Sequence, residues 1–276
     1  MKTALLQITS SDDPAENLDM VRAMMTDAAA QDARFVLTPE VTNCVSTSTT
    51  RQRAVLQHEE DDITLAGLRA QAAELGIWLL IGSLGIKTHD ADGRFANRCF
   101  MIDAQGQIVA RYDKIHMFDV QVTESETFRE SKNYRPGETA VIAETDFGKV
   151  GLTICYDLRF PHLYAALAQA GARILTVPAA FSPVTGAAHW ESLLRARAIE
   201  TGCWVLAPAQ TGTHPKTRGK TRQTHGHSLV VAPWGEVLID AGTDPGIHIF
   251  DLDDSSVSEA RRRVPSLTHV RPFTGP

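Results

Sequence analysis

Three residues whose side chains could carry out nucleophilic catalysis each follow a short apolar run of the chain. Glu40 comes after residues 35–37, Lys114 after a run that ends two residues earlier, and Cys155 after residues 150–154. Such runs predict buried strands, and α/β enzymes build their active sites where strands end. A thiol, a carboxylate and an ammonium group could together attack a carbonyl carbon, move its protons and stabilise an oxyanion.

Cys155 lies at a predicted corner between its strand and the amphipathic run 163–169, and Pro161 suits the first turn of a helix there. The first N–H groups of that helix would point back at the thiol, which favours the thiolate and could bind an oxyanion. The alternative is a buried apolar cysteine, the commoner fate of a free cysteine.

A nucleophilic cysteine needs a base or a charge partner, and histidine is the usual one. The histidines considered are His116, His162, His189, His225 and His227. No asparagine or aspartate is obviously placed to orient any of them, so a structural or exposed role is favoured for each. Glu40 and Lys114 are the stronger candidates, although Glu40 could cap a helix and Lys114 could pair with Asp113.

The elements that must position these residues alternate between strands and helices, which predicts a layered α/β fold. Strands are expected at 2–8, 35–37, 78–82, 150–154, 174–177, 204–207 and 248–252, with hairpins at 97–102/107–112 and 228–231/236–239. Helices are expected from Pro14, and at 64–75, 163–169, 189–201 and 255–263. Hairpins among the strand–helix units indicate mixed sheets in a single domain spanning residues 1–276.

Composition limits the classes of partner and cofactor. The 276 residues carry a net charge of −6, which gives no support for a nucleic-acid or anionic-membrane partner. No apolar run is long enough for a membrane helix or a signal peptide, so a cytoplasmic protein is expected. Cys44, Cys99, Cys155 and Cys203 are widely spaced, which favours free thiols and offers no metal site.

The segments Leu37-Thr-Pro-Glu40, Tyr112-Asp-Lys-Ile-His116 and Ile154-Cys-Tyr-Asp-Leu-Arg-Phe-Pro161 resemble motifs of the nitrilase, or carbon–nitrogen hydrolase, superfamily. Further matching segments are 118–120, 129–131, 185–190, 195–200, 226–228 and 233–235, so the resemblance runs from end to end. It implies an αββα sandwich, in which two mixed β-sheets lie between helical layers. It implies no cofactor.

The resemblance also implies roles for individual residues. Cys155 would be the nucleophile that forms a thioester, and Glu40 the general base. Lys114 and the backbone N–H of Tyr156 would stabilise the oxyanion, while Glu130 would position Lys114 and the substrate amide. The resemblance also places Arg159, Phe181 and Thr185 at the end of the site that binds the substrate.

A guanidinium such as that of Arg159 could grip a substrate carboxylate with two parallel hydrogen bonds. Other interpretations are a structural pair of Arg159 with Asp157, and core packing for Phe181. Both the substrate and water would be small-molecule partners of the site.

Within the family the motifs look most like the Nit branch of ω-amidases and deaminated-glutathione amidases. The implied reaction converts deaminated glutathione into α-ketoglutarate and cysteinylglycine, although residues 121–128 depart from the branch pattern. Alternatives are an ω-amidase acting on α-ketoglutaramate or α-ketosuccinamate, a nitrilase or N-carbamoyl hydrolase, and, remotely, a non-catalytic binding protein. The resemblance implies at least a homodimer, paired through residues 160–164 and 190–199.

Overall fold

Two six-stranded mixed β-sheets form the centre of the computed structural model, which describes residues 1–124 and 126–275. In spatial order the first comprises β16 (Gly246–Asp251), β1 (Lys2–Gln7), β2 (Phe35–Leu37), β3 (Trp78–Lys87), β4 (Phe95–Ile102) and β5 (Ile108–Asp113). The second comprises β15 (Val237–Asp240), β14 (Leu229–Val231), β11 (Trp204–Ala207), β10 (Ile174–Thr176), β9 (Gly148–Leu152) and β8 (Val141–Thr145).

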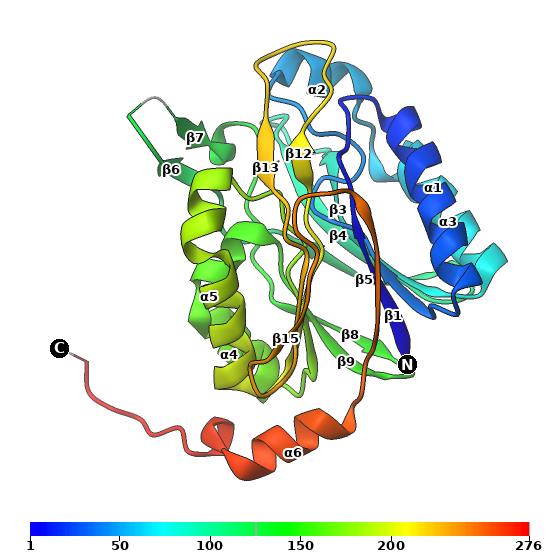
Figure 1. Cartoon of the computed structure of the whole chain (residues 1–276). Helices are drawn as coiled ribbons and strands as arrows, with labels where there is room; N and C mark the ends of the chain where they lie inside the picture. The colour runs from blue at the N-terminus through cyan, green and yellow to red at the C-terminus, as the bar shows by residue number, and fades with distance from the viewer. Residues whose placement is uncertain (125, 276) are drawn as a thin grey trace.

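Helices cover the outer face of each sheet, which confirms the predicted αββα sandwich. Figure 1 shows α1 (Pro14–Ala30) and α3 (Ile63–Leu75) on one side of the sheets, and α4 (Pro161–Gln169) and α5 (Pro183–Thr201) on the other. The remaining helices are α2 (Thr49–Val55) and α6 (Ser255–Arg263). No helix in the described ranges 1–124 and 126–275 is long and apolar enough to cross a membrane.

Strand alternation separates two cores. Leu5 of β1 belongs to the cluster between the sheets, where Leu152 and Leu175 of the second sheet also pack. Its neighbours Ala4 and Leu6 belong instead to the cluster between the first sheet and its helices. Because successive side chains of a strand point to opposite faces, a continuous apolar run can serve both cores.

The middle of each sheet is parallel and its edges are antiparallel. Strands β1, β2 and β3 run parallel, as do β9, β10 and β11. Glu40 and Cys155 each lie three residues beyond the end of such a strand, β2 and β9, and Lys114 directly follows the antiparallel edge strand β5. The chain therefore brings the three candidate residues to one end of the sandwich.

Local signals explain where the helices begin and end. The Asp13 side chain accepts hydrogen bonds from the first N–H groups of α1, and Gly76 ends α3 in a left-handed conformation with φ +63°. Helix α5 begins at Pro183, six residues before the predicted start, because proline suits a first turn and Gly186 had masked the helical pattern. Helix α2 and strand β8 were not predicted.

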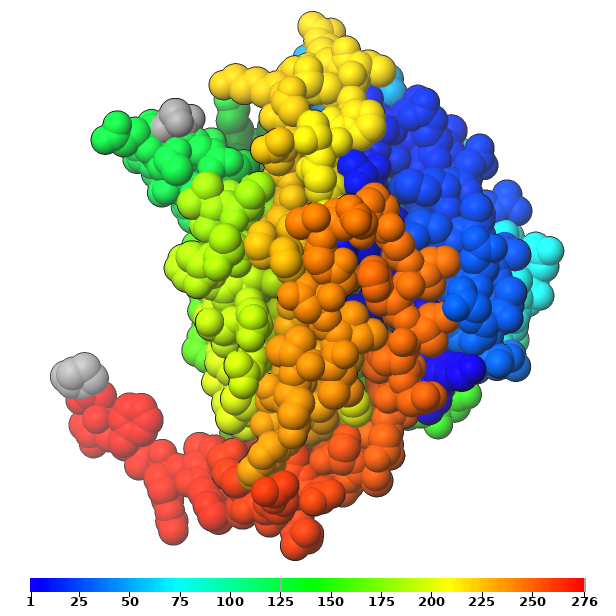
Figure 2. Space-filling model, in the orientation of Figure 1, coloured from blue at the N-terminus to red at the C-terminus, as the bar shows by residue number. Residues whose placement is uncertain are grey.

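Two small hairpins project from the sandwich. Strands β6 (Asp119–Gln121) and β7 (Thr127–Arg129) form one of them, in the connection between Lys114 and Cys155, where no strand was predicted before residue 150. Strands β12 (Thr211–Thr213) and β13 (Gln223–His225) form the other, and a long loop joins them. In Figure 2 the two hairpins, green and yellow, stand at the same end of the molecule with a hollow between them.

Candidate active site

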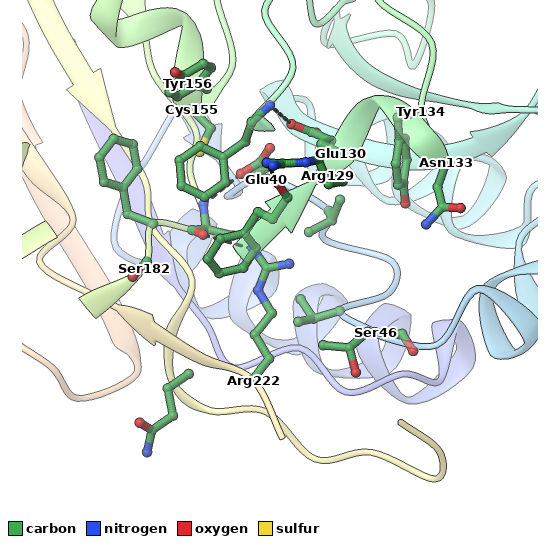
Figure 3. A pocket seen from close by; sticks show the side chains of 18 of the residues that line it. Glu40, Ser46, Arg129, Glu130, Asn133, Tyr134, Cys155, Tyr156, Ser182 and Arg222 are labelled. Carbon is green, nitrogen blue, oxygen red and sulfur yellow. Dashed lines mark hydrogen bonds between the residues drawn. The ribbon is translucent and has the colours of Figure 1, made fainter. Parts of the chain in front are cut away.

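A buried ion-pair network joins Lys114 to two glutamates. The Lys114 Nζ lies 3.0 Å from Glu40 Oε1, and 2.9 Å and 2.8 Å from the two carboxylate oxygens of Glu130. The exposed fractions of the Lys114 and Glu40 residues are 1% and 4%. Figure 3 shows Glu40, Glu130 and Cys155 converging on one part of a cavity. A buried ammonium with two carboxylates has the pairing that burial of charge requires.

Further hydrogen bonds hold the Glu40 carboxylate in one orientation. Its Oε2 accepts from the backbone N–H of Ala180 at 2.8 Å, and its Oε1 from Asn97 Nδ2 at 2.9 Å. The next residue, Val41, has φ +47°, which is rare for a β-branched residue, and its N–H donates to Ser83 Oγ at 2.8 Å. The backbone strain beside Glu40 is thus held by specific partners.

Cys155 occupies the expected tight corner, at the start of a 3-10 helix spanning Cys155–Arg159. Its φ of +51° is the left-handed conformation, and its N–H donates to Pro178 O at 2.9 Å. The predicted helix α4 does not begin beside the thiol, because the five-residue 3-10 helix intervenes. The N–H of Tyr156, near the start of that 3-10 helix, has no acceptor within the helix and is available to a group outside it.

The surroundings of Cys155 favour the protonated thiol, contrary to the expectation that its setting favours a thiolate. Burial and the nearby Glu40 carboxylate raise the pKa of Cys155 well above its ordinary value, and the lowering effect of Lys114 is weaker. Burial by itself would raise the pKa of Glu40, but Lys114 and a hydrogen bond from the thiol outweigh it, so that pKa is lowered. An ionised carboxylate therefore faces a protonated thiol, as general-base catalysis requires.

Lys114 stays an ammonium despite its burial. Desolvation lowers the pKa of a buried lysine, but the charges of Glu130 and Glu40 outweigh it and raise that pKa well above the ordinary value. A fixed positive charge beside Cys155 can stabilise negative charge that develops on a substrate oxygen.

Asp157 ties the Cys155 corner to the segment that carries Lys114. The buried carboxylate accepts hydrogen bonds from Tyr112 OH at 2.7 Å and from the backbone N–H groups of Ile154 at 2.9 Å and His116 at 3.0 Å. The His116 ring also lies against it, with Nδ1 2.7 Å from Oδ1. This histidine thus has a structural partner, and none of the five candidate histidines lines the cavity.

A cavity of about 400 Å³ opens beside the network. Phe181 and Thr185 line it, as the resemblance implied. Arg159 is not among the lining residues but lies beside two of them, with its guanidinium carbon 5.9 Å from the ring centroids of both Tyr156 and Phe181. Arg159 does not pair with Asp157; its Nη2 lies 3.2 Å from His189 Nδ1 instead.

Two residues of the site were missed in the sequence. Asn97 donates to both Glu40 and Glu130, and its only signal is an amide inside a largely apolar strand. Arg222 reaches into the cavity from the loop just before β13 and donates to Ala180 O at 3.0 Å. As one of four cations in the segment 216–222, it carried no distinguishing signal in the sequence.

Comparisons with known proteins find similar chains along nearly the whole sequence. The family model described as "Carbon-nitrogen hydrolase" matches residues 2–262. "Deaminated glutathione amidase" of Yersinia enterocolitica is 37% identical over 97% of this chain and 92% of its own, and that of Mus musculus is 39% identical over 98% and 83%. The NitFhit protein of C. elegans is 34% identical, with a TM-score of 0.89 over 98% of this chain and 65% of its own.

Proposed function

The chain belongs to the carbon–nitrogen hydrolase family and is an amide-hydrolysing enzyme, and from that premise we propose that Glu40, Lys114 and Cys155 carry out the reaction. The observation that supports this assignment most strongly is that the Lys114 Nζ lies 3.0 Å from the Glu40 carboxylate at the place where Cys155 converges with them. The directions of the pKa shifts, lowered for Glu40 and raised for Cys155 and Lys114, favour the protonation states that acyl transfer needs.

In the acylation half-reaction, Glu40 takes the thiol proton while Cys155 Sγ attacks the amide carbon. The oxyanion is stabilised by Lys114 Nζ and the Tyr156 N–H. When the C–N bond breaks, Glu40 donates its proton to the leaving nitrogen, and a thioester remains on Cys155.

In the deacylation half-reaction, Glu40 takes a proton from water, whose oxygen attacks the thioester carbon. The C–S bond breaks, the sulfur recovers the proton, and the acid product leaves. Glu130 accepts hydrogen bonds from Lys114 and from the Phe118 N–H at 2.6 Å, so it holds the cation in place throughout.

The substrate proposed is deaminated glutathione, cleaved to α-ketoglutarate and cysteinylglycine. The printed names of relatives in bacteria and mammals support this choice. Such a substrate carries a carboxylate on its acyl part. We propose that Arg159, which lies against the lining residues Tyr156 and Phe181, turns toward the cavity to bind that carboxylate, while Phe181 and Thr185 pack along the acyl chain. No carboxylate within residues 1–124 and 126–275 pairs with Arg159, so its charge is available.

A substrate panel tests the proposed function. Purified enzyme is assayed for kcat/KM on deaminated glutathione, α-ketoglutaramate, α-ketosuccinamate, an N-carbamoyl amino acid and an aliphatic nitrile. We expect deaminated glutathione to give the highest value. A higher value for the carbamoyl compound or the nitrile would overturn the substrate assignment.

We also propose a homodimer formed through the exposed side of α5, where Val184 and Ile199 are 51% and 56% exposed. Tyr164 and Trp190, which the sequence interpretation placed on this surface, are buried inside the protomer. Sedimentation should give twice the 30.1 kDa chain mass, and Ile199→Asp should lower it. The cytoplasmic location stays a prediction from composition.

A further inference from the structure

Two cations of the β12–β13 loop line the cavity without a partner of opposite charge. Lys220 and Arg222 both border it, and no carboxylate in the described ranges 1–124 and 126–275 forms an ion pair with either. The Glu40 and Glu130 carboxylates of the same cavity are already engaged with Lys114. The cavity therefore offers positive charge that is not engaged in an ion pair, next to the ion pairs of Lys114. Such a cavity is suited to an anionic group of the ligand.

Arg222 lies on the Glu40 side of the cavity. Its Nη2 donates to Ala180 O at 3.0 Å, and the N–H of the same Ala180 donates to Glu40 Oε2 at 2.8 Å. Figure 3 shows Arg222 extending from its loop toward Glu40, whereas Tyr156 lies beyond Cys155. The Tyr156 ring centroid is 5.9 Å from the guanidinium carbon of Arg159. The two arginines thus flank the reacting centre from different directions.

The chemistry determines which part of the substrate lies near each arginine. Glu40 must reach the leaving nitrogen to protonate it, so the leaving group lies on the Glu40 side. The acyl part then extends toward Arg159. An amine that departs past Glu40 meets Arg222 and Lys220 next.

We propose that Lys220 and Arg222 form a subsite for the carboxylate of the leaving group, which in the proposed substrate is the terminal carboxylate of the departing dipeptide. This inference rests on the proposed function and adds to it the recognition of the amine side. A guanidinium binds a carboxylate through two parallel hydrogen bonds, and the nearby ammonium adds a point charge.

A buried hydroxyl adds a polar group to the same subsite. Ser182 lines the cavity, is buried, and its Oγ has no hydrogen-bond partner within the described part of the chain. It lies two residues beyond Ala180, which Arg222 contacts. A dipeptide leaving group has a peptide bond before its carboxylate, and this hydroxyl can donate to or accept from that bond.

The loop that bears the two cations is fixed in advance. The Asp12 carboxylate accepts from the Thr217 N–H at 2.8 Å and from its hydroxyl at 2.9 Å. Thr47 Oγ1 accepts from the Lys220 N–H at 2.8 Å and donates to Lys220 O at 2.9 Å. Because the backbone is anchored from both sides, binding an anion there has a reduced entropic cost.

The test compares leaving groups. KM and kcat are measured for deaminated glutathione, for the same compound with its terminal carboxylate converted to a neutral amide, and for α-ketoglutaramate, whose leaving group is ammonia. We expect Arg222→Gln to raise KM for deaminated glutathione about tenfold more than for the neutral amide, and Lys220→Ala about threefold more. Arg222→Lys should recover part of this selectivity, because lysine keeps the positive charge but cannot form two parallel hydrogen bonds to a carboxylate.

Arg218→Ala is the matched control. It removes a charge from the same loop but from outside the cavity lining, so KM for all three substrates should match that of the unaltered enzyme. If Arg222→Gln raises KM equally for all three substrates, Arg222 either binds the acyl part or maintains the fold. Either result overturns the proposed subsite for the leaving group. If the unaltered enzyme hydrolyses none of the three, the proposed function fails, and the subsite fails with it.

Discussion

Charged side chains are buried and form ion pairs on one side of the cavity, whereas on the other side they are half-buried or exposed and form no ion pair within the described residues. The catalytic wall, defined as Glu40, Asn97, Lys114, Glu130 and Cys155, comes from segments that follow strands and from strand β4 itself. The cationic rim, defined as Lys220 and Arg222, comes from the loop between β12 and β13. The same cavity thus combines two electrostatic environments.

This difference in burial and pairing suggests that the catalytic wall carries out the reaction and the cationic rim selects the substrate. Buried charges are tolerated only when they are fully paired, so a change in the catalytic wall should disturb the pKa values on which proton transfer depends. The cations of the cationic rim form no ion pair with a carboxylate in residues 1–124 and 126–275, so a change there should alter mainly which anion binds. The predictions below test whether the two regions behave so differently.

The largest effect is expected from Glu40→Gln. The variant keeps the shape of the side chain but cannot take the thiol proton, so kcat should fall by at least about 1000-fold. Steady-state hydrolysis of deaminated glutathione measures it, with circular dichroism to show that the variant folds. A variant that keeps more than about one percent of kcat would show that Glu40 is not the base.

A smaller loss, of about a hundredfold in kcat, is expected from Glu130→Gln, because Lys114 would lose its main anchor. The variant should also change the pH–rate profile. The negative charge of Glu130 raises the pKa of Lys114, so its removal lowers that pKa, and the alkaline fall in activity should begin at lower pH.

Glu124→Gln is the matched control for Glu130→Gln. It removes a carboxylate from the same connection between Lys114 and Cys155, but Glu124 is exposed and outside the cavity lining. Its profile should overlay that of the unaltered enzyme. An unchanged alkaline limb in Glu130→Gln would contradict the account of Lys114.

Arg159→Gln should act on binding and spare the proton transfers. Loss of charge-assisted hydrogen bonds to the acyl carboxylate should raise KM about thirtyfold for every α-keto-acid amide, whatever its leaving group. Inhibition by α-ketoglutarate should weaken in parallel. If KM rises only for substrates with an anionic leaving group, Arg159 binds the leaving group, and its assignment to the acyl carboxylate is wrong.

The smallest effect concerns the stability of the region that carries the cationic rim. His214, just after β12, is buried, and its ring nitrogens lie 2.8 Å from Ser10 O and from Thr224 Oγ1. Burial lowers the pKa of His214 to about 4 from 6.5. The unfolded chain therefore binds the proton more readily between these values, so stability is lost as pH falls from about 6.5 through 4.

Urea unfolding measures this contribution. Between pH 7 and pH 4, the unaltered enzyme should lose about 2 kcal/mol more unfolding free energy than His214→Gln, which has no titrating ring. Parallel pH dependence in the two proteins would show that His214 does not titrate in this way.

The sequence was most informative where pattern and chemistry coincide. Apolar runs at 35–37 and 204–207 were strong enough to predict strands, and polar residues just beyond three such runs predicted residues that the structure brings together. The protonation state of Cys155 was not predictable in the same way. It depends on the burial of the thiol and its distance from Glu40, which the chain's local pattern does not encode.

The cationic rim was not predicted either. The segment 216–222 looks like a solvated charged loop, and nothing in its composition indicates that only its last cations border the cavity. Asp12 and Thr47, which fix that loop, are far from it in sequence. Contacts of this range arise from tertiary packing, so they become visible only in the folded chain.

The central claim is that Cys155 carries the acyl group as a thioester, and competition between water and hydroxylamine tests it most directly. A thioester intermediate predicts that deaminated glutathione and hydroxylamine give the acyl hydroxamate, in a proportion that rises with hydroxylamine concentration, and that Cys155→Ala gives neither hydroxamate nor cysteinylglycine. Cys99→Ala, which alters a buried thiol away from the cavity, should still form both. Cysteinylglycine release by Cys155→Ala, or hydrolysis without any hydroxamate in the unaltered enzyme, would contradict the account.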